Sequence, residues 1–345
     1  TIVFGSSADK TVSCGYIQNV YINGTGSTIS RCNTLFTMKH DAIPAYLAGQ
    51  QVLLQEPEII ELLNGSANHN FVVAYRCRDD DGGVCVIQIN PFNGAITLMN
   101  GERKFDSKRG ENPEIFYING DYYGVVYGCE GTAYTYNDDL NHLRGFLTII
   151  KIKDSNGKIS SSGETANTFV NGGEYEFTNS EFSAPYTYYT FRAEHFMYLS
   201  DDGTHFYYAF SYTIYANQSI TRGYVKTIKI TPNTPYTGFL QVSTYRYDQV
   251  DAPDLPDFLH IGTGTTYGLI LRQGTSAGNN NGLIKTLTIQ SNGNIAAKPI
   301  IDSKEIGTFS CSKTRALKIS DTICALMYTG TSNNAYVKTF NASAT

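Results

Sequence analysis

The sequence repeats one short strand-like pattern along its whole length. The pattern opens with a small residue, continues with an apolar or aromatic one, and then alternates, usually ending on Ile. Its copies are GYIQNVYI (15–22), GVCVIQI (83–89), GFLTIIKI (145–152), GYVKTIKI (223–230), GLIKTLTI (282–289) and AYVKTF (335–340). Alternation with a period of two is typical of a β-strand that buries one face. Six spaced copies therefore predict a chain built from repeated β modules.

The same context surrounds each copy of the pattern. A pair of strands precedes it, most clearly in PEIFYINGDYYGVVYG (113–128), and a turn and a fourth strand follow it, as in QSNGNIAAKP (290–299). The Asn-Gly and Asp-Gly pairs supply the positive φ that tight hairpins need. Repeated four-stranded modules are typical of a β-propeller, because sheets packed face to face around an axis bury both of their apolar faces. We expect an all-β fold, a single six-bladed β-propeller of four-stranded antiparallel blades.

The ends of the chain suggest how such a ring closes. The last module stops after its third strand, and TIVFGSS (1–7) matches a second strand or can serve as an outermost one. We expect the N-terminal strand to close the last blade, since closure hides exposed sheet edges; the alternative is a strand donated by a neighbouring molecule. The segment 48–63 has helix-like spacing, but Pro57 and its alignment with PEIFYI favour a strand. The approximate modules of the single domain 1–345 are 1–56, 57–112, 113–184, 185–253, 254–310 and 311–345.

The charge pattern narrows the possible partners. The net charge is −5, and no cluster of Lys and Arg is longer than two residues. Nucleic acids and anionic membranes require concentrated positive charge, so we expect neither as a partner. No apolar run approaches the roughly 18 residues that a membrane helix needs, so no membrane span is expected in this chain. Charged residues make up only 17% of the chain, and its 26 Tyr residues suit strands and recognition loops.

The cysteines and sequons favour an extracellular or cell-surface protein. Three Cys pairs flank candidate hairpins and are expected to form disulfides: Cys14 with Cys32, Cys77 with Cys85, and Cys311 with Cys324. The alternative is that all are buried thiols, and Cys129 has no partner in this scheme. Four sequons make Asn23, Asn64, Asn217 and Asn341 candidate glycosylation sites. A secreted glycoprotein is therefore expected.

The repeat also resembles known modules. The succession of YYGVVYG, GFLTIIKI and SNGKI is similar to β-propeller repeats of secreted and surface-layer-type proteins of archaea and bacteria. The resemblance covers most of the chain as a repeat pattern. It implies the fold and the compartment, and it adds no functional residue.

Candidate site residues are few. Asp79 and Asp81, in a run of three aspartates, could hold calcium, although a solvated hairpin turn explains them more simply; we expect no other cofactor. The turn LSDDGTHFYY (199–208) partly matches the Asp box of sialidases, in which the Asp caps a hairpin. Asp121, Glu194, Asp202 and Asp257 could approach a central channel, but the sequence does not bring them together, and no catalytic residue is assigned. Candidate binding-loop residues are Tyr134, Tyr136, Tyr186, Tyr188, Tyr189 and Tyr215.

These observations lead to a functional expectation with one alternative. We expect a non-enzymatic cell-surface protein, either a structural subunit of a surface layer, sheath or filament or an adhesin. Its partners would be further copies, other surface proteins or glycans. The alternative is a carbohydrate-active hydrolase or lyase, or a glycan-binding lectin, on the same scaffold.

Overall fold

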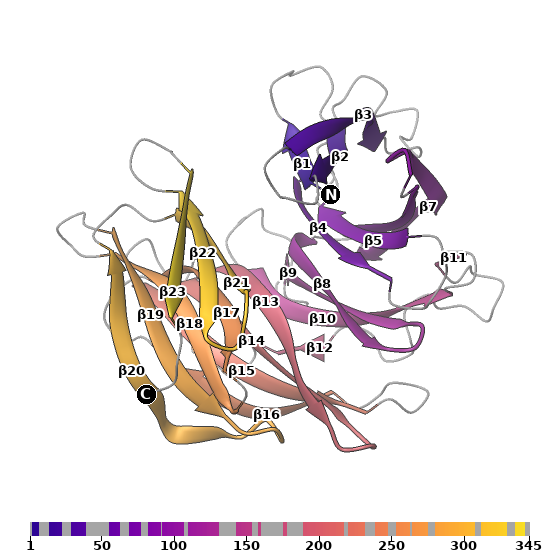
Figure 1. Cartoon of the computed structure of the whole chain (residues 1–345). Helices are drawn as coiled ribbons and strands as arrows, with labels where there is room; N and C mark the ends of the chain where they lie inside the picture. The colour runs from indigo at the N-terminus through magenta and orange to yellow at the C-terminus, as the bar shows by residue number, and fades with distance from the viewer. Residues whose placement is uncertain are drawn as a thin grey trace. The chain divides into compact units, whose positions relative to one another are not determined.

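The computed structural model describes the chain as β-strands joined by turns. It describes residues 2–6, 14–22, 29–38, 55–62, 69–76, 82–90, 92–106, 110–130, 143–153, 158–159, 175–177, 189–216, 220–231, 239–247, 253–262, 264–274, 280–307, 312–329 and 335–341. The chain divides into an N-terminal unit, residues 1–130 and 145–176, and a C-terminal unit, residues 131–144 and 177–345. Figure 1 shows the strands of both units. In the described ranges no helix is long and apolar enough to cross a membrane.

The described residues of the N-terminal unit form three antiparallel sheets. The first has the order β1 (Ile2–Ser6), β2 (Cys14–Ile22) and β3 (Ile29–Met38). The second has the order β4 (Gln55–Glu61), β5 (His69–Arg76), β6 (Gly82–Ile89) and β7 (Ile96–Asp106). The third has the order β8 (Glu111–Asn119), β9 (Tyr122–Glu130), β10 (Leu143–Lys153) and β11 (Lys158–Ile159), with β12 (Tyr175–Glu176) also on β10.

In the C-terminal unit, the part of the chain that the structure describes also forms three antiparallel sheets. The first has the order β13 (Tyr189–Asp201), β14 (Phe206–Ala216), β15 (Ile220–Ile230) and β16 (Phe239–Arg246). The second has the order β17 (Pro253–Ile261), β18 (Thr266–Gly274), β19 (Asn280–Ile289) and β20 (Ile295–Gly307). The third has the order β21 (Ser312–Lys318), β22 (Ile323–Thr329) and β23 (Ala335–Asn341).

The repeat prediction is confirmed strand by strand. The six copies of the pattern lie in β2, β6, β10, β15, β19 and β23, each in a different sheet. The predicted turns are present too: Gly120 between β8 and β9 has φ 55° and Gly293 between β19 and β20 has φ 81°. The segment around Pro57 is a strand, as expected. The chain is therefore an all-β propeller protein made of antiparallel sheets.

The prediction of six four-stranded blades is not confirmed. Among the described residues, three sheets have four strands, one has five and two have three. Five sheets begin with the first strand of the module, whereas the N-terminal sheet begins with its second. The structure therefore supports five blades that contain the module's first strand.

The prediction that the N-terminal strand closes the last blade is wrong. Strand β1 pairs with β2, with Ile2 opposite Gln18 and Ser6 opposite Cys14. TIVFGSS is therefore the second strand of the first module, beside the copy of the pattern in β2. This is the other position that its sequence matches.

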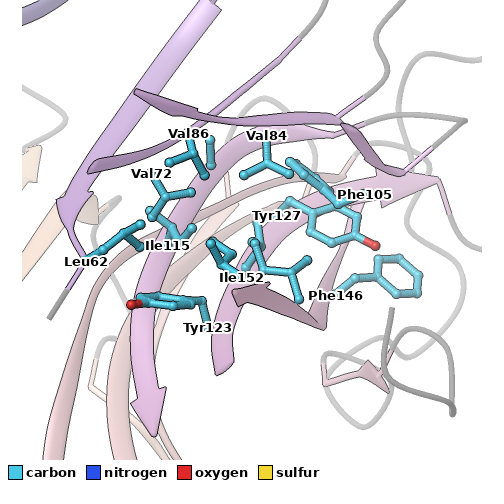
Figure 2. Packing of buried hydrophobic residues seen from close by; sticks show 13 residues of the cluster. Leu62, Val72, Val84, Val86, Phe105, Ile115, Tyr123, Tyr127, Phe146 and Ile152 are labelled. Carbon is cyan, nitrogen blue, oxygen red and sulfur yellow. The ribbon is translucent and has the colours of Figure 1, made fainter. Parts of the chain in front are cut away.

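Alternation builds the core between neighbouring sheets. The sheets of β4–β7 and β8–β10 pack their apolar faces together, as Figure 2 shows. Phe105 of β7 lies 4.8 Å from Tyr127 of β9, measured between ring centroids. The buried residues of this cluster are Leu62, Val72, Ala74, Val84, Val86, Phe105, Ile115, Tyr123, Val125, Tyr127, Phe146, Ile150 and Ile152. The same face-to-face packing occurs in the C-terminal unit, between the sheets of β17–β20 and β21–β23.

The disulfide prediction is contradicted. Cys85 and Cys324 are buried free thiols, so the pairs Cys77–Cys85 and Cys311–Cys324 are wrong; Cys77 and Cys311 themselves lie outside the described residues. Both faces of β6 are buried, and Cys85 lies opposite Val73 and packs with Val73 and Ile87 in one apolar cluster. Burial also raises the pKa of the Cys324 thiol.

Register excludes the third pair, Cys14 with Cys32. Gly15 is opposite Met38 and Val20 is opposite Arg31, so the two cysteines lie near opposite ends of the β2–β3 pair. A separation of about five residues corresponds to ~17 Å along a strand. A disulfide requires Cα atoms within about 7 Å. Cys129 lies in β9.

Candidate functional site

The first strands of five sheets share an irregularity at the same place. The ladder skips residues between Gln55 and Glu58 in β4, between Glu111 and Glu114 in β8, and between Asp254 and Asp257 in β17. In these three strands a proline precedes the acidic residue that ends the skip, in the segments EPE, NPE and LPD. The ladder skips in the same way between Glu194 and Met197 in β13 and between Ser312 and Arg315 in β21, where no proline is present. Proline has no N–H for the ladder, so it is tolerated at such a bulge. Bulges of this kind re-aim side chains and occur next to active sites.

An ion pair closes the corner between β5 and β8. Nη2 of Arg76 lies 3.1 Å from Oε1 of Glu111, and the two side chains are 18% and 9% exposed. Arg76 is the last residue of β5, opposite both Gln55 of β4 and Gly82 of β6. The pair therefore joins the sheet of β4–β7 to the first strand of the next sheet. Removing one partner of such a buried pair leaves an uncompensated charge.

Two glycines allow this corner to form. A Cβ on Gly110 would lie 2.3 Å from the Cα of Gly82, and a Cβ on Gly82 would lie 2.0 Å from the ring of Phe105. Only hydrogen atoms fit there. The backbone before β8 can thus lie directly on the start of β6, which brings Glu111 within reach of Arg76.

The backbone of the corner adopts an unusual conformation. Asn112 has φ 45°, and it is the one non-glycine residue with positive φ in the described part of the chain. Such a conformation costs of order 1 kcal/mol or more and persists where the surroundings impose it, most often at functional sites. Asn112 lies between the ion-paired Glu111 and Pro113, directly before Glu114. We call Glu58, Arg76, Glu111, Asn112 and Glu114 the bulged-strand site.

Glu58 and Glu114 differ in their surroundings from Asp257, the acidic residue at the equivalent position of β17 in the C-terminal unit. Asp257 is fully buried, and its carboxylate accepts hydrogen bonds from the N–H of Phe258 at 2.8 Å and from the N–H of Ala316 in β21. It fastens two neighbouring sheets. Glu58 and Glu114 carry one more methylene group and are half-buried. They lie on β4 and β8, which pack against each other, so the N-terminal unit holds two carboxylates at equivalent places of adjacent first strands.

The fastening role of Asp257 gives a stability prediction. Replacing Asp257 with alanine is expected to lower the free energy of unfolding of the C-terminal unit by about 2–5 kcal/mol, because the buried N–H of Phe258 and the partly buried N–H of Ala316 lose their acceptor. Urea unfolding followed by tyrosine fluorescence would measure it. Asp257→Asn keeps one acceptor oxygen and should lose clearly less. An alanine variant as stable as the unmodified chain would show that Asp257 fastens nothing.

The other carboxylates considered from sequence have separate surroundings. Asp121 lies in the β8–β9 turn, where its backbone oxygen accepts the N–H of Ile152 at 2.7 Å. Glu194 lies in β13 opposite Ser211, next to a bulge. Asp202 lies in the β13–β14 turn. None of these three belongs to the bulged-strand site.

Asp202 has the hairpin-capping role expected of the Asp-box-like turn. Its Oδ1 accepts the N–H groups of Thr204 at 2.8 Å and of His205 at 2.7 Å, and its Oδ2 accepts the Tyr207 hydroxyl at 2.9 Å. The backbone bond from Thr204, the His205 side chain and the backbone of His205 hold the pKa of Asp202 well below its usual range. The Asp202 carboxylate is thus engaged in hydrogen bonds within and next to its own turn.

The remaining predicted sites are only partly covered by the structure. Among the described residues, no group of three His, Cys, Asp or Glu side chains could hold a metal ion, and Asp79 and Asp81 lie outside those residues. Asn341 is exposed at the end of β23, whereas Asn23, Asn64 and Asn217 lie outside them. Glycosylation and calcium binding stay predictions.

The tyrosines of the predicted binding loops are also only partly covered. Tyr189 lies opposite Ala216 and Tyr215 opposite Thr190, so both belong to the paired strands β13 and β14 rather than to a loop. Tyr134, Tyr136, Tyr186 and Tyr188 lie outside the described residues. A binding role for these residues stays a prediction.

Sequence reasoning missed the bulged-strand site, although its signal was present. The spacing of an acidic residue directly after a proline recurs at Glu58, Glu114 and Asp257 in otherwise different segments. No sequence pattern indicates the ion pair of Arg76 with Glu111, because it depends on how the two sheets that contain β5 and β8 pack together.

No protein-family model matches the sequence, and no curated protein matches it. Several solved structures of propeller proteins are similar in architecture. An α-L-arabinofuranosidase of family GH93 from Fusarium graminearum has a TM-score of 0.48 and 10% identity, covering 98% of this chain and 88% of its own. An α-L-arabinanase from Penicillium chrysogenum has a TM-score of 0.44 and 11% identity, covering 95% and 85%. Semaphorin 2a from Drosophila has a TM-score of 0.43 and 10% identity, covering 96% and 64%.

These likenesses correct the functional expectation. The prediction of a non-enzymatic subunit of a surface assembly, or of an adhesin, is contradicted, because the similar structures are mostly named as arabinofuranosidases and arabinanases. The carbohydrate-active alternative fits them better. The resemblance to surface-layer repeats is supported only as far as the propeller fold. Identities near 10% leave the activity to be argued from the chain's own residues.

Proposed function

We propose that the chain is a carbohydrate-active propeller that hydrolyses glycosidic bonds at the bulged-strand site. The observation that carries the proposal is the equivalent placement of two half-buried glutamates, Glu58 and Glu114, each directly after a proline at the bulge of adjacent first strands. Glycoside hydrolysis uses two carboxyl groups, one as general acid and the other as base or nucleophile.

The rest of the site supports this role. The buried pair of Arg76 and Glu111 holds the start of β8, and the imposed conformation of Asn112 orients the residues that follow. Catalytic carboxyl groups need such fixed supports, because small displacements from the reactive geometry are costly. Arg76 and Glu111 are positioning residues in this scheme, while Glu58 and Glu114 act on the substrate.

The charges of the site favour a neutral glycan. The bulged-strand site contains three carboxylates, those of Glu58, Glu111 and Glu114, and one guanidinium, which pairs with Glu111, and the whole chain carries a net charge of −5. An anionic sugar would meet like charges there. The extracellular location and self-association expected from the sequence stay predictions beside this proposal.

The test is the release of reducing ends by the purified chain. Soluble arabinan, xylan, galactan and β-glucan are supplied as neutral substrates, and polygalacturonate as an anionic one. We expect cleavage of at least one neutral glycan and none of polygalacturonate. Binding of a glycan without cleavage would replace the hydrolase with a lectin. Neither binding nor cleavage across the panel would overturn the carbohydrate-active function altogether.

A further inference from the structure

One face of the sheet of β13–β16 carries a ladder of aromatic rings. Phe196 stacks on Phe210 with ring centroids 4.2 Å apart, and Tyr212 stacks on Tyr224 at 5.3 Å. Tyr208 and Phe210 are buried. Tyr198 continues the ladder beside Tyr208, at 5.8 Å and edge-on, but its side chain is 48% exposed. The ladder therefore ends in a large aromatic ring that faces solvent.

Two contacts fix the Tyr198 ring. Its hydroxyl donates a 2.5 Å hydrogen bond to Oδ2 of Asp201, and the edge-on contact with Tyr208 holds the ring from the other side. Partial burial, together with Asp201, raises the pKa of Tyr198 to about 12, so the hydroxyl remains a donor at neutral pH. A ring held in this way loses little conformational entropy when a ligand stacks on it.

The turn beneath the ring is fixed as well. Oδ1 of Asp201 accepts the N–H of Gly203 at 3.3 Å, and Asp202 caps the same turn as described above. The Ser200 hydroxyl donates a 2.6 Å hydrogen bond to the backbone oxygen of Ser291, in the β19–β20 turn of the neighbouring sheet. The Tyr198 ring and the Asp201 carboxylate thus lie at a turn between β13 and β14 that is also hydrogen-bonded to the neighbouring sheet.

We propose that Tyr198 and Asp201 form an accessory carbohydrate-binding site for neutral sugars, separate from the bulged-strand site. The proposal rests on the carbohydrate-active function above. A sugar ring presents a face of C–H groups that packs on the flat apolar surface of Tyr, while its hydroxyl groups donate to the fixed Asp201 carboxylate. Asp201 and Asp202 lie side by side in the turn, so anionic sugars are disfavoured.

Binding to insoluble polysaccharide tests this site without requiring hydrolysis. The purified chain and its variants are incubated with insoluble xylan, insoluble mannan and cross-linked arabinan, and the protein left in solution is measured against polysaccharide concentration. Tyr198→Ala is expected to weaken binding about five- to tenfold, the range of a lost aromatic contact. Tyr198→Phe keeps the stacking face but loses the hydrogen bond to Asp201, so its affinity should lie between that of Tyr198→Ala and that of the unmodified chain.

A matched control is Phe92→Ala. Phe92 is also an exposed aromatic residue, 95% exposed in the β6–β7 turn, but its side chain has no hydroxyl group that a carboxylate could fix. Its variant should bind like the unmodified chain. Equal binding by Tyr198→Ala, an equal loss with Phe92→Ala, or no binding of any of these polysaccharides by the unmodified chain would overturn the proposal. Binding that depends on Tyr198 in a chain that releases no reducing ends would uphold this site and refute the hydrolase.

Discussion

Replacing Glu114 with glutamine is expected to slow hydrolysis of a cleaved glycan by about a hundred- to ten-thousandfold. The amide has nearly the shape of the carboxyl group, but it can neither take up nor release the proton that the reaction transfers. Because the substitution is isosteric, affinity for the glycan should change much less than the rate. Steady-state rates of reducing-end release, with KM measured in the same series, separate the two effects. Glu58→Gln is expected to have a loss of the same order.

Glu61→Gln is the matched control for these substitutions. Glu61 ends β4, is half exposed and pairs with Nδ1 of His69 at 2.9 Å, outside the bulged-strand site. Its variant should hydrolyse glycans at the rate of the unmodified chain. Thermal unfolding of all three variants identifies a loss of rate that comes from a loss of structure. Full activity in folded Glu58→Gln and Glu114→Gln would remove both residues from the mechanism.

Gly110→Ala is expected to destabilise the N-terminal unit by about 3 kcal/mol or more. Its Cβ would lie 2.3 Å from the Cα and 2.6 Å from the N of Gly82, which are backbone atoms that cannot rotate away. Strands β6 and β8 would have to separate, and Glu111 would move from Arg76. Urea unfolding measures the loss, and the rate of glycan hydrolysis should fall with it.

Gly264→Ala provides the comparison for Gly110→Ala. A Cβ on Gly264, in the β17–β18 turn, meets nothing within 4 Å. Its variant should unfold within about 0.5 kcal/mol of the unmodified chain. If Gly110→Ala were equally harmless, the close backbone contact between Gly110 and Gly82 would not be what holds the corner together.

The architecture could be predicted from the sequence because its cause is local. Alternation in GYVKTIKI and its relatives requires only that one side of a strand be buried, and the turn at Gly120 requires only its own positive φ. The pairing partner of the N-terminal strand could not be predicted in the same way. TIVFGSS suits two places in a sheet equally well, and the choice of β2 as its partner depends on the whole N-terminal sheet.

Residues whose role depends on register were predicted less well. The spacing of Cys77 and Cys85 suits a disulfide across a hairpin, but the register places Cys85 opposite Val73, as a buried free thiol in an apolar cluster. The ion pair of Arg76 with Glu111 joins two sheets, and neither residue stands out in the sequence. The glutamates themselves were visible as an acidic residue after a proline. Their segments did not show that Glu58 and Glu114 lie half-buried on adjacent strands. Nor did they show that the Asp257 carboxylate accepts a backbone hydrogen bond from the next sheet.

Chemical rescue tests the role of the two glutamates most directly. Glu58→Ala and Glu114→Ala are assayed on an activated aryl glycoside of the cleaved sugar, with and without azide or formate. A small anion can occupy the place of a missing catalytic carboxylate and take over its role. We expect added anion to restore turnover in one of these two variants and to leave Glu61→Ala unchanged. If neither variant is rescued, although both are folded and the unmodified chain is active, the bulged-strand site is not the catalytic site.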